Sequence, residues 1–166
     1  MNKKILIISF LIISFNCSLA FAVPDEIYLF RHSEKLTGKN PELSEAGKAR
    51  ANNLVTLFKE YRNIHIFSSN YKRTLQTAAP LQAHFSTDIN IYNASQLFDL
   101  KIKLLKLNGV VVVIGHSNTT PALAELLLNE KVPAMSEIQF TQYFRLNKKP
   151  NGNDTEYDVT HHKMSF

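Results

Sequence analysis

Cysteine is almost absent from this chain of 166 residues. The single example, Cys17, lies in an N-terminal segment that we expect to be removed. The remaining chain would then have no disulfide, no thiolate nucleophile and no cysteine ligand for a metal ion. An oxidising compartment would pose no problem for such a protein.

Long apolar runs are also missing. The N-terminus has Lys3 and Lys4, an apolar stretch over residues 5–15, and then Ala20-Phe21-Ala22. This order is typical of a secretory signal peptide with an Ala-x-Ala cleavage site. The stretch is shorter than the roughly 20 apolar residues that a membrane-spanning helix needs. We therefore predict a signal peptide over residues 1–22, cleavage after Ala22, and a periplasmic or secreted protein without a stable membrane span.

A lipoprotein anchored through Cys17 is the alternative for this segment. It is less favoured, because Asn16 stands where a small residue is expected before the lipidated cysteine. Residues 23–166 have the length of one domain. They contain no internal repeat, low-complexity tract or linker that would divide them.

A concentration of positive charge is the third feature that the sequence lacks. The formal net charge is +5, two units of which come from Lys3 and Lys4. The other basic residues are scattered and form no stripe with interleaved aromatic residues, which argues against nucleic acid as a partner. A mild basic excess suits a small anionic substrate.

One tetrapeptide carries most of the functional information. Leu29-Phe30-Arg31-His32 ends an apolar run, at the point where a buried strand should give way to a loop. Arg31 and His32 would thus lie side by side at the rim of a sheet. A guanidinium binds phosphate oxygens in a fork and an imidazole can attack phosphorus, so this pair suits phosphoryl transfer.

Two further segments repeat the arrangement. Residues 64–67 are apolar and lead into Ser68-Ser69-Asn70-Tyr71-Lys72-Arg73, and the β-branched run 110–114 ends in Gly115-His116-Ser117-Asn118. Each is an apolar strand with a basic or imidazole group at its carboxyl end, followed by a predicted helix. Since ligands of open α/β sheets bind beyond the carboxyl ends of the strands, the three segments predict one anionic-ligand pocket.

These three motifs in this order resemble the histidine phosphatase superfamily, which includes phosphoglycerate mutases and phosphohistidine phosphatases. Within it, the Arg-His-x-Glu-Lys start is most similar to a small bacterial exported branch. The resemblance runs from about Glu26 to about Leu128. It implies a phosphoglycerate mutase-like fold: a single-domain, three-layer αβα sandwich with a mostly parallel central sheet.

The resemblance also implies roles. His32 would be the nucleophile that forms a phosphohistidine, Arg31 and Arg73 would bind the phosphoryl oxygens, and His116 would donate a hydrogen bond to the same group. No cofactor and no metal are expected. Ser69 and Asn118 would either bind the phosphate or cap the helices that follow them.

The general acid that protonates the leaving group is less clear from the sequence. Relatives supply a carboxylic acid from a later helix or directly after the second histidine, but here Ser117 follows His116. The candidates are Glu34, Asp99 and Glu137, with Glu34 slightly preferred because it stays near His32 whatever the later loops do. Without an acid, substrates with good leaving groups would be favoured, such as phosphohistidine or acyl phosphates.

The sequence thus predicts a metal-independent phosphatase that acts on phosphomonoesters or phosphoramidates. A non-catalytic phosphate-binding module of the same fold is the alternative, and a mutase is disfavoured because no long insertion could form a lid. The substrate could be a phosphorylated small molecule, an envelope sugar phosphate or a phosphoprotein, and the oligomeric state stays open.

Strands alternate with helices along the predicted domain. We expect strands over residues 26–31, 64–68, 89–92 and 110–114, and a terminal antiparallel pair over 138–146 and 156–162. Helices are expected over 44–61, 71–85, 95–107 and 119–129, with Ser44 and Ser95 as caps. This alternation favours a mostly parallel sheet covered on both faces.

Overall fold

The computed structural model describes residues 23–150 and 156–166. Its strands are β1 (Glu26–Arg31), β2 (Ile64–Ser69), β3 (Ile89–Tyr92), β4 (Val110–Gly115), β5 (Gln142–Lys148) and β6 (Tyr157–Lys163). Its helices are α1 (Glu45–Leu54), a short 3-10 helix η1 (Val55–Leu57), α2 (Lys72–Phe85), α3 (Leu97–Leu104) and α4 (Thr119–Leu128). The predicted signal peptide, residues 1–22, lies outside the described residues. Across the two described ranges, no helix combines the length and the apolar character that crossing a membrane requires.

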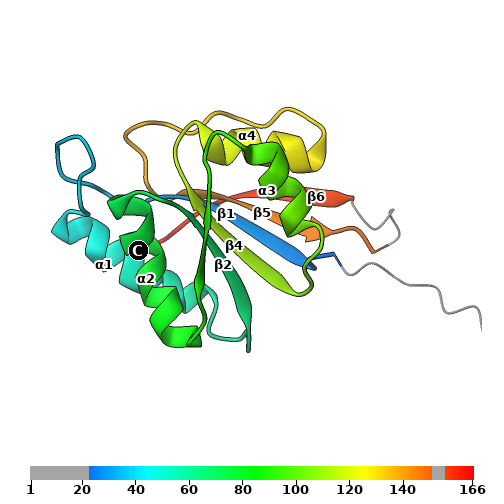
Figure 1. Cartoon of the computed structure of the whole chain (residues 1–166), viewed down its shortest axis with the longest axis horizontal. Helices are drawn as coiled ribbons and strands as arrows, with labels where there is room; N and C mark the ends of the chain where they lie inside the picture. Colours follow the sequence, from blue (N-terminus) through cyan, green and yellow to red (C-terminus); the bar gives the residue numbers. More distant parts are fainter. Residues whose placement is uncertain (1–22, 151–155) are drawn as a thin grey trace, which may run out of the picture.

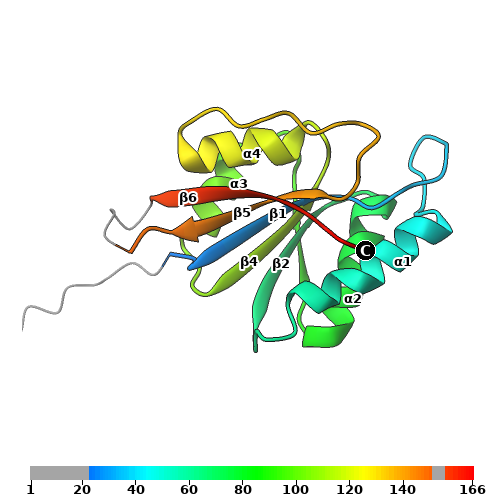
Figure 2. The ribbon, with the colours of Figure 1, turned by 180° about the vertical axis from the view of Figure 1, so that it is seen from behind.

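The six strands form one sheet in the order β3-β2-β4-β1-β5-β6. The pairs β2–β3, β2–β4 and β1–β4 are parallel, and β5 and β6 join antiparallel at one side. Figures 1 and 2 show the sheet between two helical layers, with α3 and α4 on one face and α1 and α2 on the other. The predicted three-layer αβα fold with a mostly parallel sheet is therefore confirmed.

The period-2 alternation of the strands builds two cores. In β1, Ile27 and Leu29 pack with the helices α3 and α4, whereas Tyr28 and Phe30 pack with α1 and α2. Strand β4 divides its valines in the same way. Because both faces of these central strands are covered, their sequences read as continuous apolar runs.

The strand register brings the three motifs together. Strand β4 lies between β2 and β1, so the carboxyl ends of all three are neighbours. Arg31 is paired with Gly115, and Ser68 is paired with Ile114. The side chains that follow these pairs consequently share one edge of the sheet.

Three elements differ from their predicted bounds by more than one residue. The helix expected over 44–61 is capped by Ser44, whose hydroxyl accepts from the Gly47 N–H, but it ends at Leu54 and tightens into η1. The Thr56 hydroxyl donates to the carbonyl of Asn53 there, which competes with the regular helical pattern. The expectation that this helix reaches Tyr61 was therefore wrong.

The other two differences come from side chain–backbone contacts. Ser95 does not cap α3, because its N–H and hydroxyl both donate to the Asn93 side-chain oxygen, and the helix begins only at Leu97. The strand predicted from residue 138 begins at Gln142. The carbonyls of Ser136 and Gln139 accept hydrogen bonds from Arg31, which keeps this segment out of the sheet.

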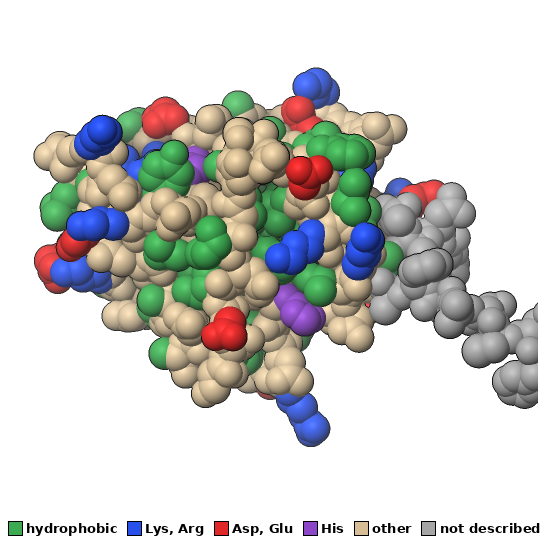
Figure 3. Space-filling view, in the orientation of Figure 1, with side chains coloured by type: hydrophobic (Ala, Val, Ile, Leu, Met, Phe, Trp, Pro, Cys, Tyr) green, Lys and Arg blue, Asp and Glu red, His purple; other side chains and the backbone are tan. Residues whose placement is uncertain are grey.

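Charges of both signs are dispersed over the face that Figure 3 shows. Lys and Arg side chains stand among Asp, Glu and hydrophobic ones, and on this face the described residues form no continuous basic stripe. The exposed large hydrophobic side chains of the described residues are Leu36, Tyr71, Ile91, Phe98, Ile102 and Ile138.

Gly47 allows α1 to pack closely against the loop after β1. A Cβ at this position would lie 2.0 Å from the carbonyl oxygen of Glu34, which is far closer than van der Waals contact. In an ordinary helix, alanine is more stable than glycine by roughly 0.5–1 kcal/mol. Here we expect Gly47→Ala to lower the free energy of unfolding by about 1–3 kcal/mol, measured by urea denaturation.

The control is Asn52→Ala on the exposed side of α1. It should leave stability unchanged or raise it slightly, since alanine is the better helix former. Stabilisation by Gly47→Ala would contradict the close approach of α1 to the loop.

Candidate active site

His32 stands directly beyond the end of β1 and is 3% exposed. Its backbone N–H donates to the carbonyl of Gly115 at 3.0 Å, which ties it to the end of β4. Its ring Nδ1 lies 2.7 Å from the carbonyl oxygen of Ser33. Because a carbonyl only accepts, Nδ1 carries the proton and Nε2 retains the lone pair that a nucleophile needs.

The turn after His32 is anchored to α2. The Ser33 backbone N–H donates to the Thr77 hydroxyl at 3.0 Å, and that hydroxyl donates to the carbonyl of Arg73 at 2.7 Å. Sequence reasoning did not identify Thr77. Its spacing of one helical turn from Arg73 was the available signal, because residues four apart share a helix face.

Arg31 divides its donors between the protein and the pocket. Its Nη1 donates to the carbonyl of Ser136 at 2.6 Å, and its guanidinium lies 4.1 Å from the ring centre of Phe140. Its Nη2 is 3.8 Å from a carboxylate oxygen of Glu137, and its buried Nε has no hydrogen-bond partner. Nε and Nη2 form the edge with which a guanidinium binds an anion in a two-pronged way, and in the ligand-free protein Glu137 lies beside Nη2. No sequence signal pointed to Phe140, which lies in an irregular loop.

Arg73 and His116 contact each other across the pocket. The Arg73 Nη2 lies 3.2 Å from His116 Nδ1, and the guanidinium stacks 4.6 Å from the ring centre of Tyr71. The Arg73 Nε is buried without a hydrogen-bond partner. His116 is 5.6 Å from His32, measured between ring centres.

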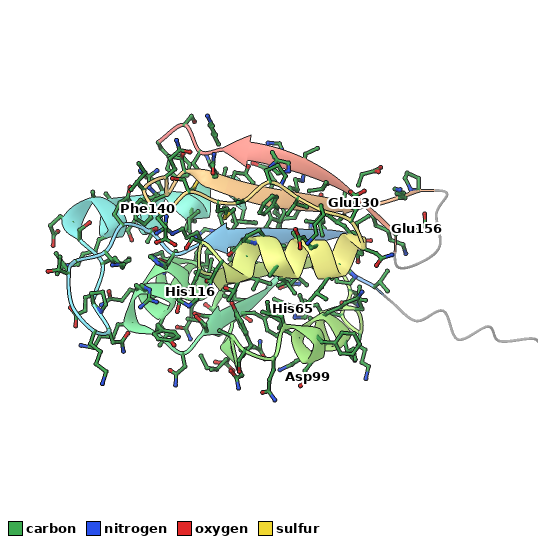
Figure 4. All side chains as sticks on the ribbon, turned by 90° about the horizontal axis from the view of Figure 1, so that it is seen from above. His65, Asp99, His116, Glu130, Phe140 and Glu156 are labelled. Atoms are coloured by element: carbon green, nitrogen blue, oxygen red, sulfur yellow. The ribbon has the colours of Figure 1, made fainter. Side chains whose placement is uncertain are left out.

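These groups line one open cavity of about 1090 Å³. The side chains of Arg31, His32, Arg73 and His116 all reach it, so the structure brings the predicted tetrad together. Figure 4 shows His116 and Phe140 toward the same end of the sheet, with Glu130 and Glu156 at the other end. The cavity is much larger than a phosphate group and leaves room for a leaving group.

Both histidines are held in the neutral form. Burial, with a further contribution from Arg31 and Arg73, lowers the pKa of His32 to about 3. Burial and the same two arginines lower the pKa of His116 to about 4. A neutral His32 at physiological pH has its Nε2 lone pair free for attack.

Ser69 and Asn118 were expected either to bind the phosphate or to cap the helices that follow them. Ser69 is fully buried and its hydroxyl contacts the ring of His116, so it neither caps α2 nor lines the cavity. Asn118 lines the cavity and makes no side-chain cap hydrogen bond to α4. The side-chain cap is therefore not formed, and a contact of Asn118 with phosphate stays a prediction.

Glu34, the preferred acid, does not line the cavity. Its carboxylate is bound by the side-chain fork of Arg50, with Nε 2.9 Å and Nη2 2.7 Å from the oxygens. Burial would raise the pKa of Glu34, but the hydrogen bonds from Arg50 outweigh it and the pKa lies below its ordinary value. The preference for Glu34 as the acid therefore does not fit this geometry.

Asp99 is exposed on α3 and Figure 4 shows it well away from His116, so it does not fit either. Glu137 lines the cavity, and the Ser117 hydroxyl donates to its carboxylate at 2.5 Å. That hydrogen bond and the nearby Arg31 hold the pKa of Glu137 below its ordinary value. In the ligand-free protein Glu137 is consequently a carboxylate and not an acid.

Within residues 23–150 and 156–166, no group of three His, Cys, Asp or Glu side chains is arranged to hold a metal ion. The positive charge of the pocket comes from the two guanidinium groups and from Lys35, which also lines it. The guanidiniums match the two-pronged geometry of a tetrahedral oxyanion.

Comparison with known families agrees with the resemblance that the motifs indicate. A sequence model described as the histidine phosphatase superfamily (branch 1) matches residues 27–97. This segment includes Arg31, His32 and Arg73, and His116 follows it. No curated protein sequence matches the chain.

Solved structures share the fold at low sequence identity. A protein assigned as the phosphohistidine phosphatase SixA in Agrobacterium tumefaciens is 20% identical, with a TM-score of 0.56, covering 82% of this chain and 96% of its own. SixA bound to tungstate is 12% identical, with a TM-score of 0.61, covering 83% and 96%. A mycobacterial glucosyl-3-phosphoglycerate phosphatase is also 12% identical, with a TM-score of 0.61, covering 84% and 97%. These likenesses establish the fold, while the named substrates belong to those proteins.

The depressed pKa values predict how stability depends on pH. In the unfolded chain both histidines return to an ordinary pKa of 6.5, so the unfolded state binds more protons than the folded state below that pH. Stability is thus complete above pH 6.5 and falls as the pH drops toward the folded pKa values. Each histidine contributes up to about 1.4 kcal/mol per pH unit to this slope.

We expect His32→Gln to remove one histidine's share of that slope between about pH 6 and 5, measured by urea denaturation at several pH values. Asn52→Ala on the exposed side of α1 supplies the control, and it should leave the slope unchanged because it removes no titratable group. An identical slope in the wild type and His32→Gln would show that His32 is not held neutral.

Proposed function

We propose that this chain, a member of the histidine phosphatase superfamily, is a phosphatase that works through a phosphohistidine on His32 and needs no metal ion. It is proposed to act in the periplasm or outside the cell, after removal of residues 1–22. Phosphomonoesters and phosphoramidates are the substrate classes that the pocket could accept.

The observation that carries this proposal is the state of His32. Its Nδ1–H is held by the Ser33 carbonyl, so Nε2 is an unprotonated nucleophile at the cavity that Arg31 and Arg73 also line. The two arginines offer Nε atoms without partners inside the described structure. An unprotonated nucleophile beside two unused anion donors is what in-line attack on a phosphoryl group requires.

The reaction would proceed in two displacements. First, Nε2 of His32 forms a bond to phosphorus while the bond from phosphorus to the leaving oxygen or nitrogen breaks. Water then attacks phosphorus, and the bond to Nε2 breaks and returns its electron pair to the ring. One water proton stays on the inorganic phosphate, and the other passes through solvent to the leaving oxygen or nitrogen. The guanidiniums of Arg31 and Arg73 would hold the phosphoryl oxygens throughout, which is the main electrostatic contribution in such transfers.

Neither candidate acid near the pocket is placed to protonate the leaving group, and this favours some substrates over others. Glu34 is engaged by Arg50, and Glu137 is held in its charged form by Ser117 and Arg31. A leaving group that needs little protonation is then preferred, such as the imidazole of a phosphohistidine or an aryl oxide. The name of the SixA relatives agrees with the phosphoramidate class. A phosphoprotein, an envelope sugar phosphate and a small phosphomonoester all stay within the proposal.

A non-catalytic phosphate-binding module is the second candidate. The same two arginines would serve it equally well. It would have no use for a neutral His32 with a free Nε2, and this observation favours the enzyme.

Replacement of His32 separates the two candidates. We expect His32→Ala to abolish hydrolysis of para-nitrophenyl phosphate while inorganic phosphate still binds, because the arginine forks remain. Arg73→Ala should lower kcat/KM by on the order of 10²–10³-fold, the usual cost of losing one donor to a transferring group. The wild type should also form an acid-labile phosphoenzyme that His32→Ala lacks.

Lys72→Ala is the matched control for Arg73→Ala. Lys72 is the adjacent cation on α2, but it is exposed and pairs with Glu42 at 3.0 Å. All assays include excess chelator, and activity should persist, since guanidiniums neutralise the phosphoryl oxygens. Turnover by His32→Ala at the wild-type rate, or loss of activity with chelator that zinc or magnesium restores, would contradict the proposed mechanism.

Leaving-group dependence tests the missing acid. We expect aryl phosphates and phosphoramidates to be hydrolysed much faster than alkyl phosphates, because an alkoxide needs a proton in the transition state. Glu137→Gln should change the alkyl-to-aryl rate ratio by less than about twofold, as should Glu34→Gln and Asp99→Asn. A selective loss of alkyl phosphate hydrolysis in Glu137→Gln would instead identify Glu137 as the acid.

A further inference from the structure

Both ring nitrogens of His116 are engaged, and the partners determine which one carries the proton. Nδ1 lies 3.2 Å from Nη2 of Arg73, and Nε2 lies 2.9 Å from the hydroxyl of Ser69. A guanidinium can only donate, so Nδ1 accepts. The neutral ring therefore has its proton on Nε2 and donates it to Ser69.

The hydroxyl of Ser69 is oriented to accept that proton. The Thr74 hydroxyl donates to the carbonyl oxygens of Ser69 and Tyr71, at 2.7 and 2.9 Å. Thr74 consequently has no proton left for Ser69, and the Ser69 hydroxyl donates to the Thr74 oxygen at 3.1 Å. Ser69 and Thr74 are both fully buried, which keeps water from substituting for this chain.

This arrangement conflicts with the binding of a phosphate group. In the ligand-free tautomer His116 presents a lone pair at Nδ1 toward Arg73, and a phosphoryl oxygen in contact with that nitrogen would meet the lone pair instead of a donor. The Nε2 proton cannot serve, since it is held by Ser69. A hydrogen bond from Nδ1 to the anion requires a second proton on the ring.

We propose that Ser69 is a positioning residue that holds the Nε2–H tautomer of His116, and that binding of a doubly charged tetrahedral oxyanion is coupled to uptake of one proton from solvent at His116 Nδ1. The inference rests on the proposed function, because it takes the pocket to be the phosphoryl site. The Nδ1 lone pair gains the proton and no other bond changes. The Ser69 oxygen stabilises the resulting imidazolium through Nε2–H.

The charges around His116 make the coupling strong. The titratable and charged groups that contact the ring or line the same cavity come from the end of β1 and the loop after it, the β2–α2 region and the loop before β5: Arg31, His32, Lys35, Tyr71, Arg73 and Glu137. Burial and the two arginines keep the pKa of His116 near 4 in the free protein. An anion that engages both guanidiniums offsets their repulsion of a third positive charge, so the ring becomes protonated only when the pocket is filled.

Sulfate is the appropriate probe, because it stays doubly charged at all pH values where the protein is folded and does not itself bind a proton. Binding is measured by isothermal titration calorimetry near neutral pH in two buffers with different ionisation enthalpies. The wild type should take up about one proton per sulfate, seen as a buffer-dependent enthalpy. The uptake should decrease as the pH falls toward about 4, where about half of the free His116 rings are already protonated.

Ser69→Ala removes the acceptor of Nε2–H. We expect the proton uptake of this variant to fall well below that of the wild type and its sulfate affinity to fall on the order of tenfold. Nitrogen-15 NMR of the imidazoles should report Nε2–H for His116 in the wild type and a loss of that single tautomer in Ser69→Ala.

Ser68→Ala is the matched control. Ser68 is adjacent and fully buried, but its hydroxyl donates to the carbonyl of Ser69 and not to His116. The proton uptake of Ser68→Ala and the tautomer of its His116 should match those of the wild type.

The outcomes separate this inference from the function on which it rests. If the wild type binds neither sulfate nor phosphate, the phosphoryl site itself is wrong. If it binds sulfate without proton uptake, or if Ser69→Ala keeps full uptake and the Nε2–H tautomer, the inference is overturned and the site stands. Should Ser69→Ala not fold, the NMR tautomer and the buffer dependence of the wild type still decide the matter.

Discussion

Arg31 is paired with Gly115 where β1 lies beside β4, and the pocket depends on this register. The next residue of each strand is a histidine, so one pairing places His32 and His116 with ring centres 5.6 Å apart. The hydrogen bond from the His32 N–H to the Gly115 carbonyl continues the ladder past the strand ends. A slip of one residue would turn every side chain of the strand to the other face of the sheet and exchange the two cores. Apolar packing on both faces thus determines the position of the reactive groups.

The pocket that results is strongly cationic yet contains two neutral imidazoles. Arg31 and Arg73 supply the charge, and their presence, together with burial, is what keeps His32 and His116 unprotonated. In the proposed mechanism, the same two groups would keep the nucleophile neutral and bind the anion. Glu137 is the one carboxylate of the described structure that reaches the cavity, and its contact with Arg31 gives the empty site a partial counter-charge.

The sequence predicted the fold and the tetrad because both rest on local patterns. Apolar runs located β1, β2 and β4, and the residue types at their carboxyl ends located Arg31 and His116. The contacts that engage Glu34 and delay β5 join segments far apart in the chain, whereas the shortened α1 and the late start of α3 come from local contacts. Arg50 binds Glu34 across 16 positions, and Arg31 binds Ser136 across 105, and neither pair leaves a local signature. The same long-range contact of Arg31 accounts for the late start of β5. The sequence predicts a strand from residue 138, but β5 begins at Gln142.

Arg31 and Arg73 also differ in whether they hold a loop of the protein in place. One nitrogen of Arg31 is bonded to the backbone of the loop before β5, and Phe140 of that loop stacks on its guanidinium. Within the part of the chain that the structure describes, the Arg73 guanidinium contacts the side chains of His116 and Tyr71. Truncation of Arg31 would therefore disturb the loop before β5 together with the proposed anion contact, and its kinetic effect would mix the two. Arg73 is the position at which a loss of phosphate affinity can be assigned to a single side chain.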